Sequence, residues 1–132
     1  LGGTVLLPQP TVKADADGLL PNQHYSFWPY TNLTDGRIEL GRELTRVHCR
    51  PGPPNKLGYR NVHGWLAYQI DHVEFTKSFD PCLDAAHPDF GCNTECYCCE
   101  YFVELETLGP LRTLAPGAAA THIETWTLRA LG

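Results

Sequence analysis

The chain has 132 residues, and its 10 Lys and Arg are outnumbered by 15 Asp and Glu, which gives a formal net charge of −5. This acidic balance, without any cluster of Lys or Arg, excludes the nucleic-acid-binding proteins that rely on a basic surface. No apolar run approaches the ~20 residues that span a bilayer and no signal-peptide pattern is present, so we expect a soluble protein without a membrane partner and slightly favour the cytoplasm.

The predicted elements are β-strands, because β-branched and aromatic residues recur in short runs that are separated by Gly and Pro. In chain order these strands are 4–7, 24–28, 44–49, 65–70, 73–79, 93–97, 101–108, 111–114 and 122–128. Asp71 and His72 predict a hairpin turn between two of them, whereas 49–56 and 80–91 are predicted loops. No helical periodicity exceeds about two turns. We therefore predict an all-β fold, an antiparallel β-sandwich that forms a single domain over residues 1–132.

The strand near the C-terminus carries two carboxylates, Glu104 and Glu106, at alternate positions. Side chains alternate between the faces of a strand, so both acids are predicted on the face opposite Val103 and Leu105. Neighbouring carboxylates can raise one another's pKa toward values that suit a general acid or base. The same alternation is also typical of any half-exposed antiparallel strand, and from the residues alone this plainer interpretation is favoured.

The six cysteines leave three interpretations open. Four of them, Cys92, Cys96, Cys98 and Cys99, lie close together, with Cys49 and Cys82 elsewhere. An even number is compatible with disulfides, but the spacing matches no zinc template. We favour free thiols, predict no metal site, and place Cys98 and Cys99 in a turn.

The histidines show no metal-binding or protease spacing, and two of them, His63 and His87, lie in polar loops where functional groups concentrate. The large aromatic residues could include a platform on which a sugar ring stacks, although burial in the core is favoured for rings of this size. These aromatic residues are Trp28, Tyr30, Trp65, Tyr68 and Trp126.

Five segments carry a resemblance to a known family. They are GGTVLLP, LPNQHYSFWPYTNLTD, KLGYRNVHGWLAY, HPDFGCNTE and LETLGPLRTLAPGAAATHIETW. Together they resemble an uncharacterised bacterial domain family related to galactose mutarotase (aldose 1-epimerase), and the likeness covers nearly all of the chain. The resemblance implies a galactose-mutarotase-like sandwich of which this chain is the C-terminal half. Because the chain also begins within a predicted strand and contains no Met, we expect a processed or truncated product.

The resemblance also implies roles for individual residues. The Glu of the Leu-Glu-Thr element is the general base in mutarotases, which corresponds to Glu106 here. The mutarotase His that acts as the acid precedes the region covered, so His63 is the only substitute. The implied substrate contacts are Lys56, Lys77, Asp89, Glu95 and Glu104, and no cofactor is implied.

Three functions follow as hypotheses. The first is a carbohydrate-binding β-sandwich without the full catalytic machinery, because a fold does not by itself imply an activity. The second is an epimerase or mutarotase-type isomerase in which Glu106 is the general base. The third is a structural or assembly protein, because half of a large sandwich leaves a sheet face or edge uncovered, and a homodimer would bury it.

Overall fold

The computed structural model describes residues 2–132, and its regular secondary structure is almost entirely β-strand, arranged in two antiparallel sheets. The strands are β1 (Thr4–Pro8), β2 (Tyr25–Phe27), β3 (Ile38–Glu39), β4 (Leu44–His48), β5 (Asn55–Tyr59), β6 (Trp65–Ile70), β7 (Val73–Phe79), β8 (Thr94–Cys98), β9 (Val103–Thr107) and β10 (Glu124–Ala130). Two short helical turns, η1 (Asp15–Asp17) and α1 (Pro88–Gly91), complete the described elements. The predicted all-β class is confirmed.

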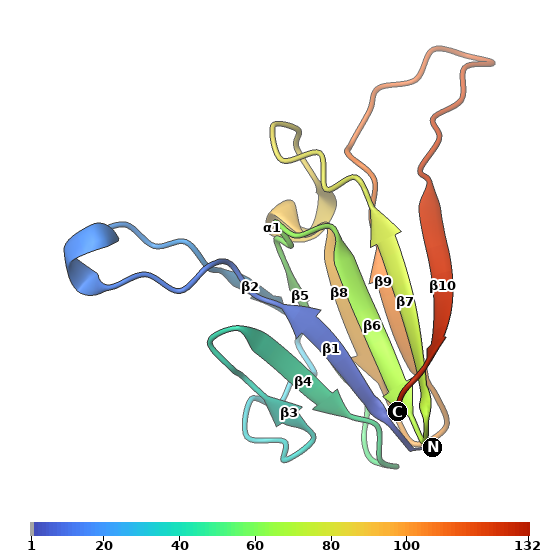
Figure 1. Ribbon diagram of the computed structural model, residues 1–132. Helices are drawn as coiled ribbons and strands as arrows, with labels where there is room; N and C mark the ends of the chain where they lie inside the picture. Colours follow the sequence, from blue (N-terminus) through green and yellow to red (C-terminus); the bar gives the residue numbers. More distant parts are fainter. Residues whose placement is uncertain (1) are drawn as a thin grey trace.

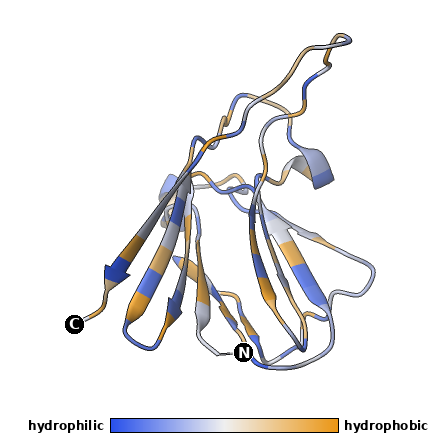
Figure 2. Cartoon of the chain, turned by 90° about the vertical axis from the view of Figure 1, so that its right-hand side faces the viewer, coloured by the Kyte–Doolittle hydropathy of each residue, from blue (hydrophilic) through white to orange (hydrophobic). Residues whose placement is uncertain are grey.

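The strands divide into a six-stranded sheet with the order β10-β7-β6-β1-β4-β3 and a four-stranded sheet with the order β2-β5-β8-β9 (Figure 1). The sheets lie face to face as two layers, which is the sandwich arrangement expected for strands with one apolar face. Hydrophobic and hydrophilic residues alternate along the strands, as the colours of Figure 2 show.

The core lies between the two sheets and receives side chains from both. The six-stranded sheet contributes Val5, Leu7, Val47 and Leu66, and the four-stranded sheet contributes Leu57, Tyr59, Cys96 and Cys98, with Val103 and Leu105 partly buried against them. Because neighbouring residues along a strand face opposite ways, the residues between these core positions lie on the outer faces of the sheets. Glu104 and Glu106 are therefore on the outer face of the four-stranded sheet, as predicted.

The predicted hairpin is confirmed. Its strands have the predicted bounds, Trp65–Ile70 and Val73–Phe79, and Asp71 adopts the left-handed conformation with a φ of 50° at the turn. Such a conformation suits the short turns that join twisted antiparallel strands, and Asp tolerates it better than most residues.

Strand prediction was wrong in three places and in opposite senses: a strand was predicted at 111–114, whereas β3 and β5 were not predicted. Residues 111–114 form no strand; Leu111 and Leu114 are exposed there, and no neighbouring strand supplies the hydrogen bonds that would hold them extended. Conversely, Asn55–Tyr59 forms β5, although 49–56 was predicted to be a loop. Asn, Lys and Gly favour strands weakly, and pairing with β2 and β8 on both sides overrides that preference.

The thiols of all six cysteines are free, and all but Cys82 are buried. Cys98 ends β8 and does not lie in a turn, which corrects that part of the prediction. Among residues 2–132, no three side chains of His, Cys, Asp or Glu are grouped so that they could hold a metal ion. In the same part of the chain, no helix has the length and apolarity needed to cross a membrane.

The surface of the molecule is large for its size. The accessible area is 8153 Å², whereas a compact monomer of 14.7 kDa exposes about 6,900 Å². Two long segments, 9–24 and 109–123, project away from the sheets (Figure 1). In addition, β10 lies at the end of the six-stranded sheet and is exposed over most of its length.

Candidate functional site

The candidate site lies on the outer face of the four-stranded sheet, where polar residues from three strands form a row. The register of the sheet places Ser26 opposite Gly58, Gly58 opposite Glu95, and Glu95 opposite Glu106. Side chains of directly paired residues lie on the same face of a sheet. Glu106 therefore has Glu95 as its cross-strand neighbour.

Lys56 joins the two carboxylates. Its Nζ lies 2.7 Å from Glu95 Oε2 and 3.0 Å from Glu106 Oε1, and it donates a hydrogen bond to Glu106 Oε2 at 3.2 Å. The same ammonium group lies 4.8 Å from the centre of the Trp28 ring, a distance at which a cation is attracted to an aromatic face. We call Trp28, Lys56, Glu95 and Glu106 the outer cluster.

The members of the outer cluster differ in exposure. Glu95 is almost fully buried, with 2% of its surface exposed, and one of its oxygens, Oε1, is buried without a hydrogen-bond partner. The Glu106 side chain keeps 32% of its surface exposed, and Trp28 is partly exposed. Glu106 and the Trp28 ring therefore offer surfaces to a ligand, and Glu95 lies beneath them and supports Lys56.

The charge states of the cluster follow from this burial. Burial raises the pKa of Glu95 above its ordinary value, and the ion pair with Lys56 offsets only part of that rise. The nearby carboxyl group of Asp89, which is exposed, also raises the pKa of Glu95. Burial opposes the charge of Lys56, but its bonds to Glu95 and Glu106 outweigh this effect and raise its pKa.

Gly58 makes the outer cluster possible. A Cβ at this position would lie 2.9 Å from Cys92 Sγ and 3.1 Å from both the Glu95 side chain and the Trp28 ring. Contacts this short would force the neighbours to move. The absence of a side chain in the middle of β5 therefore leaves the space that Trp28 and Glu95 occupy.

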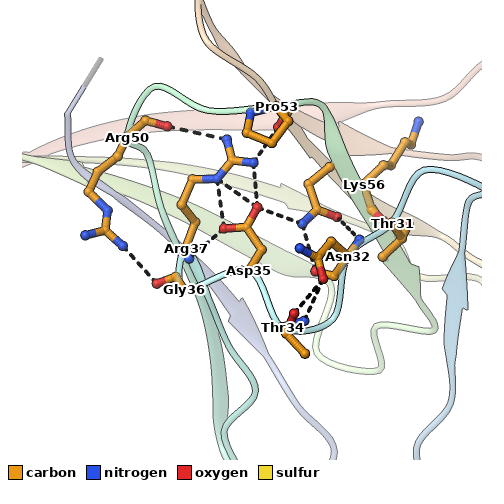
Figure 3. A network of polar contacts seen from close by, with 10 residues as sticks. Thr31, Asn32, Thr34, Asp35, Gly36, Arg37, Arg50, Pro53 and Lys56 are labelled. Atoms are coloured by element: carbon orange, nitrogen blue, oxygen red, sulfur yellow. Dashed lines mark hydrogen bonds and ion pairs between the residues drawn. The ribbon is translucent and has the colours of Figure 1, made fainter.

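A polar network fixes the loop that follows Trp28 (Figure 3). Arg37, which is buried, pairs with Asp35 at 2.6 Å and donates to the carbonyl of Pro53. Asn55 of β5 donates to Asp35 Oδ2 and to the carbonyl of Asn32, each at 3.0 Å. Hydrogen bonds from Arg37 lower the pKa of Asp35 well below its usual range. The loop is therefore tied to β5.

The same loop is also hydrogen-bonded to the backbone of two residues of the outer cluster. Thr31 accepts a hydrogen bond from the backbone N–H of Trp28 at 2.8 Å and donates one to the carbonyl of Lys56. One hydroxyl group thus connects the backbones of two cluster residues that are far apart in the sequence. Rigid support of this kind holds binding groups in place before a ligand arrives.

A second group of the same residue types lies at the open edge of the sandwich, between β7, β9 and β10. Lys77 Nζ lies 3.2 Å from Glu124 Oε1 and 5.3 Å from the centre of the Trp126 ring. Lys77 also donates to the carbonyl of Leu105 at 2.8 Å, and Thr107 and Trp126 donate to Glu124. We call Lys77, Thr107, Glu124 and Trp126 the edge cluster.

The structure separates the remaining predicted site residues from Glu106 in different ways. His63 Nε2 bonds the carbonyl of Gln9 at 2.8 Å and lines a hollow with Trp65 and Leu44 on the side of the six-stranded sheet. It is therefore on the opposite layer from Glu106. Glu104 shares the strand and face of Glu106 but is exposed and pairs in register with Tyr97.

Sequence reasoning identified Lys56, Glu95 and Glu106 singly, as implied contacts or a base, but not the contacts among them. It also grouped Trp28 with four other aromatic residues without distinguishing it. The signal that could have found the cluster is the alternation of β5, in which Lys56 and Gly58 occupy one face and Leu57 and Tyr59 the other. That signal was missed because this segment was taken for a loop up to Lys56.

Comparison with protein-family models, with curated proteins and with solved structures yields no match to this chain.

Proposed function

We propose that this protein binds a neutral monosaccharide on the outer face of the four-stranded sheet. The observation that carries the proposal is the contact of Lys56 with Trp28 and with both carboxylates of the outer cluster. Sugar hydroxyl groups donate to carboxylates and accept from ammonium groups, and charged partners strengthen such hydrogen bonds. The C–H face of a sugar ring packs on an aromatic ring such as that of Trp28.

Charge favours a neutral sugar over a sugar acid or a sugar phosphate. The ammonium group of Lys56 lies between the carboxyl groups of Glu95 and Glu106, with that of Asp89 close to Glu95. That ammonium group is already paired with two of the carboxylates, so an anionic ligand would meet uncompensated negative charge. Hydroxyl groups meet no such repulsion.

The proposal is tested by titration calorimetry of the wild-type protein with methyl β-D-glucopyranoside and methyl β-D-galactopyranoside, and by the thermal shift that each sugar causes. Trp28→Ala should weaken binding of the preferred sugar by about tenfold or more, because the stacking surface is lost. Trp126→Ala is the matched control, since Trp126 stands beside a Lys–Glu pair in the edge cluster. A wild-type protein that binds neither sugar, even at high millimolar concentration, would contradict the proposal.

An epimerase activity at the same site is the second candidate, and the cross-strand pair of Glu95 and Glu106 favours it. Glu106 would take the proton from the anomeric hydroxyl group. As the bond between the anomeric carbon and the ring oxygen breaks, the Asp89–Glu95 carboxyl pair would donate a proton to the ring oxygen. Reclosure of the open-chain aldehyde from its other face, with both proton transfers reversed, gives the other anomer.

The exposed strand β10 favours an assembly role in addition. This seven-residue strand lies at a sheet edge, with 63% of Trp126 and 76% of Leu128 exposed. A long edge strand with exposed apolar residues is a surface on which another strand can pair. We propose that a second copy of the chain pairs there, so that the two β10 strands run antiparallel about a two-fold axis.

A further inference from the structure

A tight turn precedes β8 and follows the buried His87. In this turn, α1, three consecutive residues have positive φ, namely Asp89 at 50°, Phe90 at 63° and Gly91 at 93°. Only Gly adopts this conformation without a steric penalty from its Cβ. Asp89 and Phe90 are therefore strained, and such strain persists only where surrounding contacts hold it.

A hydrogen bond from β2 and a buried neighbour beside β5 hold the turn against the four-stranded sheet. Ser26 of β2 donates its hydroxyl hydrogen to the carbonyl of Asp89 at 2.7 Å. The N–H of Cys92 closes the turn onto the carbonyl of Pro88 at 2.9 Å, and Cys92 itself is fully buried beside Gly58. The position of the turn is thus fixed by β5, which carries Lys56, and by β2, which Trp28 directly follows.

The turn lies beside the buried end of the outer cluster, because Ser26, which holds it, is in the same row as Gly58 and Glu95. The Asp89 carboxyl group lies near enough to Glu95 to raise the pKa of that buried carboxyl group, and Glu95 Oε1 is buried without a hydrogen-bond partner. The next residue, Phe90, has 95% of its surface exposed, which is more than any other large hydrophobic residue in the described part of the chain. An almost fully exposed Phe in a strained conformation contributes nothing to the core.

We propose that the Asp89–Phe90 turn is a preformed wall of the sugar site, in which Phe90 supplies a second aromatic surface and Asp89 a hydroxyl-binding carboxylate beside the outer cluster. This inference rests on the proposed function. It refines the ligand class to a pyranose with C–H surfaces for both Trp28 and Phe90 and hydroxyl groups on its rim. A turn that is already held by such contacts loses little entropy when the ligand binds.

Phe90→Gly tests this proposal, because the substitution should relieve backbone strain and also remove the aromatic ring. The first change should preserve or raise stability, and the second should weaken sugar binding. Gly adopts the observed φ of 63° without strain, so the unfolding temperature should stay the same or rise. The dissociation constant for whichever methyl glycoside the wild type prefers should nevertheless increase about 3- to 10-fold, because an aromatic contact is lost. Phe90→Ala should show the same loss of affinity without the gain in stability.

Tyr101→Ala is the control, since Tyr101 is an exposed aromatic residue just beyond the other end of β8, and it should leave the dissociation constant unchanged. If Phe90→Gly binds as the wild type does while Trp28→Ala does not, the wall is overturned and the proposed function stands. If the wild type binds neither glycoside, the proposed function fails and the wall fails with it. Equal losses in Phe90→Gly and Tyr101→Ala would also overturn the proposal.

Discussion

The outer cluster and the edge cluster contain the same three residue types, a Lys, a Trp and Glu, yet they differ in how completely their polar atoms are bonded. In the edge cluster both oxygens of Glu124 accept hydrogen bonds. In the outer cluster Glu95 keeps a buried oxygen without a partner. A cluster whose atoms are all bonded stabilises the fold, whereas one with unmet bonding capacity is poised for a ligand.

The pKa values of Glu124 and Glu95 shift in opposite directions, in line with this difference in hydrogen bonding. Burial opposes the ionisation of Glu124, but hydrogen bonds from Thr107, Trp126 and Lys77 outweigh it and lower the pKa below its ordinary value. Burial of Glu95 prevails over its ion pair with Lys56 and raises the pKa. Ionised Glu124 thus stabilises the folded state, and ionised Glu95 costs stability.

The largest effect is expected on catalysis. If the site interconverts anomers, Glu106→Gln should reduce the accelerated rate by about 100-fold or more, because the amide cannot accept the proton. The rate is measured by the change in optical rotation of freshly dissolved α-D-glucose and α-D-galactose.

Two variants control for this result. Glu124→Gln removes the corresponding charge from the edge cluster, and Glu104→Gln removes a charge from the same strand and face as Glu106. Both should retain the wild-type rate. A Glu106→Gln protein that is as fast as the wild type would remove this residue from any mechanism.

The next largest effect is expected on the oligomeric state, and it tests whether β10 forms a dimer interface. The wild-type protein should be a dimer in light scattering coupled to size exclusion, and Leu128→Lys should shift it to a monomer at micromolar concentration, because like charges would meet across the two-fold axis. Thr125→Lys places the same charge on the opposite face of β10 and should dissociate the dimer less. A wild-type monomer at these concentrations would refute the proposed pairing.

The smallest effects are on stability, and their signs should be opposite. At neutral pH, Glu124→Gln should lower the free energy of unfolding by about 1–2 kcal/mol, since hydrogen bonds to a charged acceptor are weakened. Glu95→Gln should raise it by up to about 1 kcal/mol, because a buried charge with an unpartnered oxygen is removed. Urea unfolding of the three proteins measures both changes.

The pH dependence of the free energy of unfolding tests whether the ionisation of Glu95 and Glu124 causes these changes. The stability from Glu124 is present above its ordinary pKa and is lost as the pH falls through its lowered folded-state value. The cost of ionised Glu95 is present above its raised folded-state pKa and disappears as the pH falls through that value. The advantage of Glu95→Gln should therefore vanish on acidification first. A variant effect that does not change with pH would contradict the electrostatic explanation.

Prediction from the sequence succeeded where local patterns are strong. The bounds of β6 and β7 follow from their dense β-branched and aromatic residues and the short turn between them. The faces of Glu104 and Glu106 follow from alternation alone. The segment 111–114 shows the limit of the same reasoning, because a strand needs a partner that its own residues do not reveal.

The candidate site was only partly predictable. A resemblance supplied the expected roles of Lys56, Asp89, Glu95 and Glu106, and also those of Lys77 and His63, which the structure places elsewhere. Alternation can place Lys56 on the outer face of its strand, but it does not show which carboxylates Lys56 and Lys77 each contact. Contacts between residues that are about fifty positions apart separate them, and such contacts depend on the register of the sheets.

The sequence by itself determined the β class, the main hairpin and the alternation that puts the acids of β9 outside the core, because these features depend on neighbouring residues. The tertiary structure alone decided that β5 is a strand, that Gly58 leaves room for Trp28, and that Glu95 is buried opposite Glu106. Strand pairing joins distant segments, and burial depends on what covers a residue from elsewhere in the chain. The chemistry of the site therefore arises from the packing.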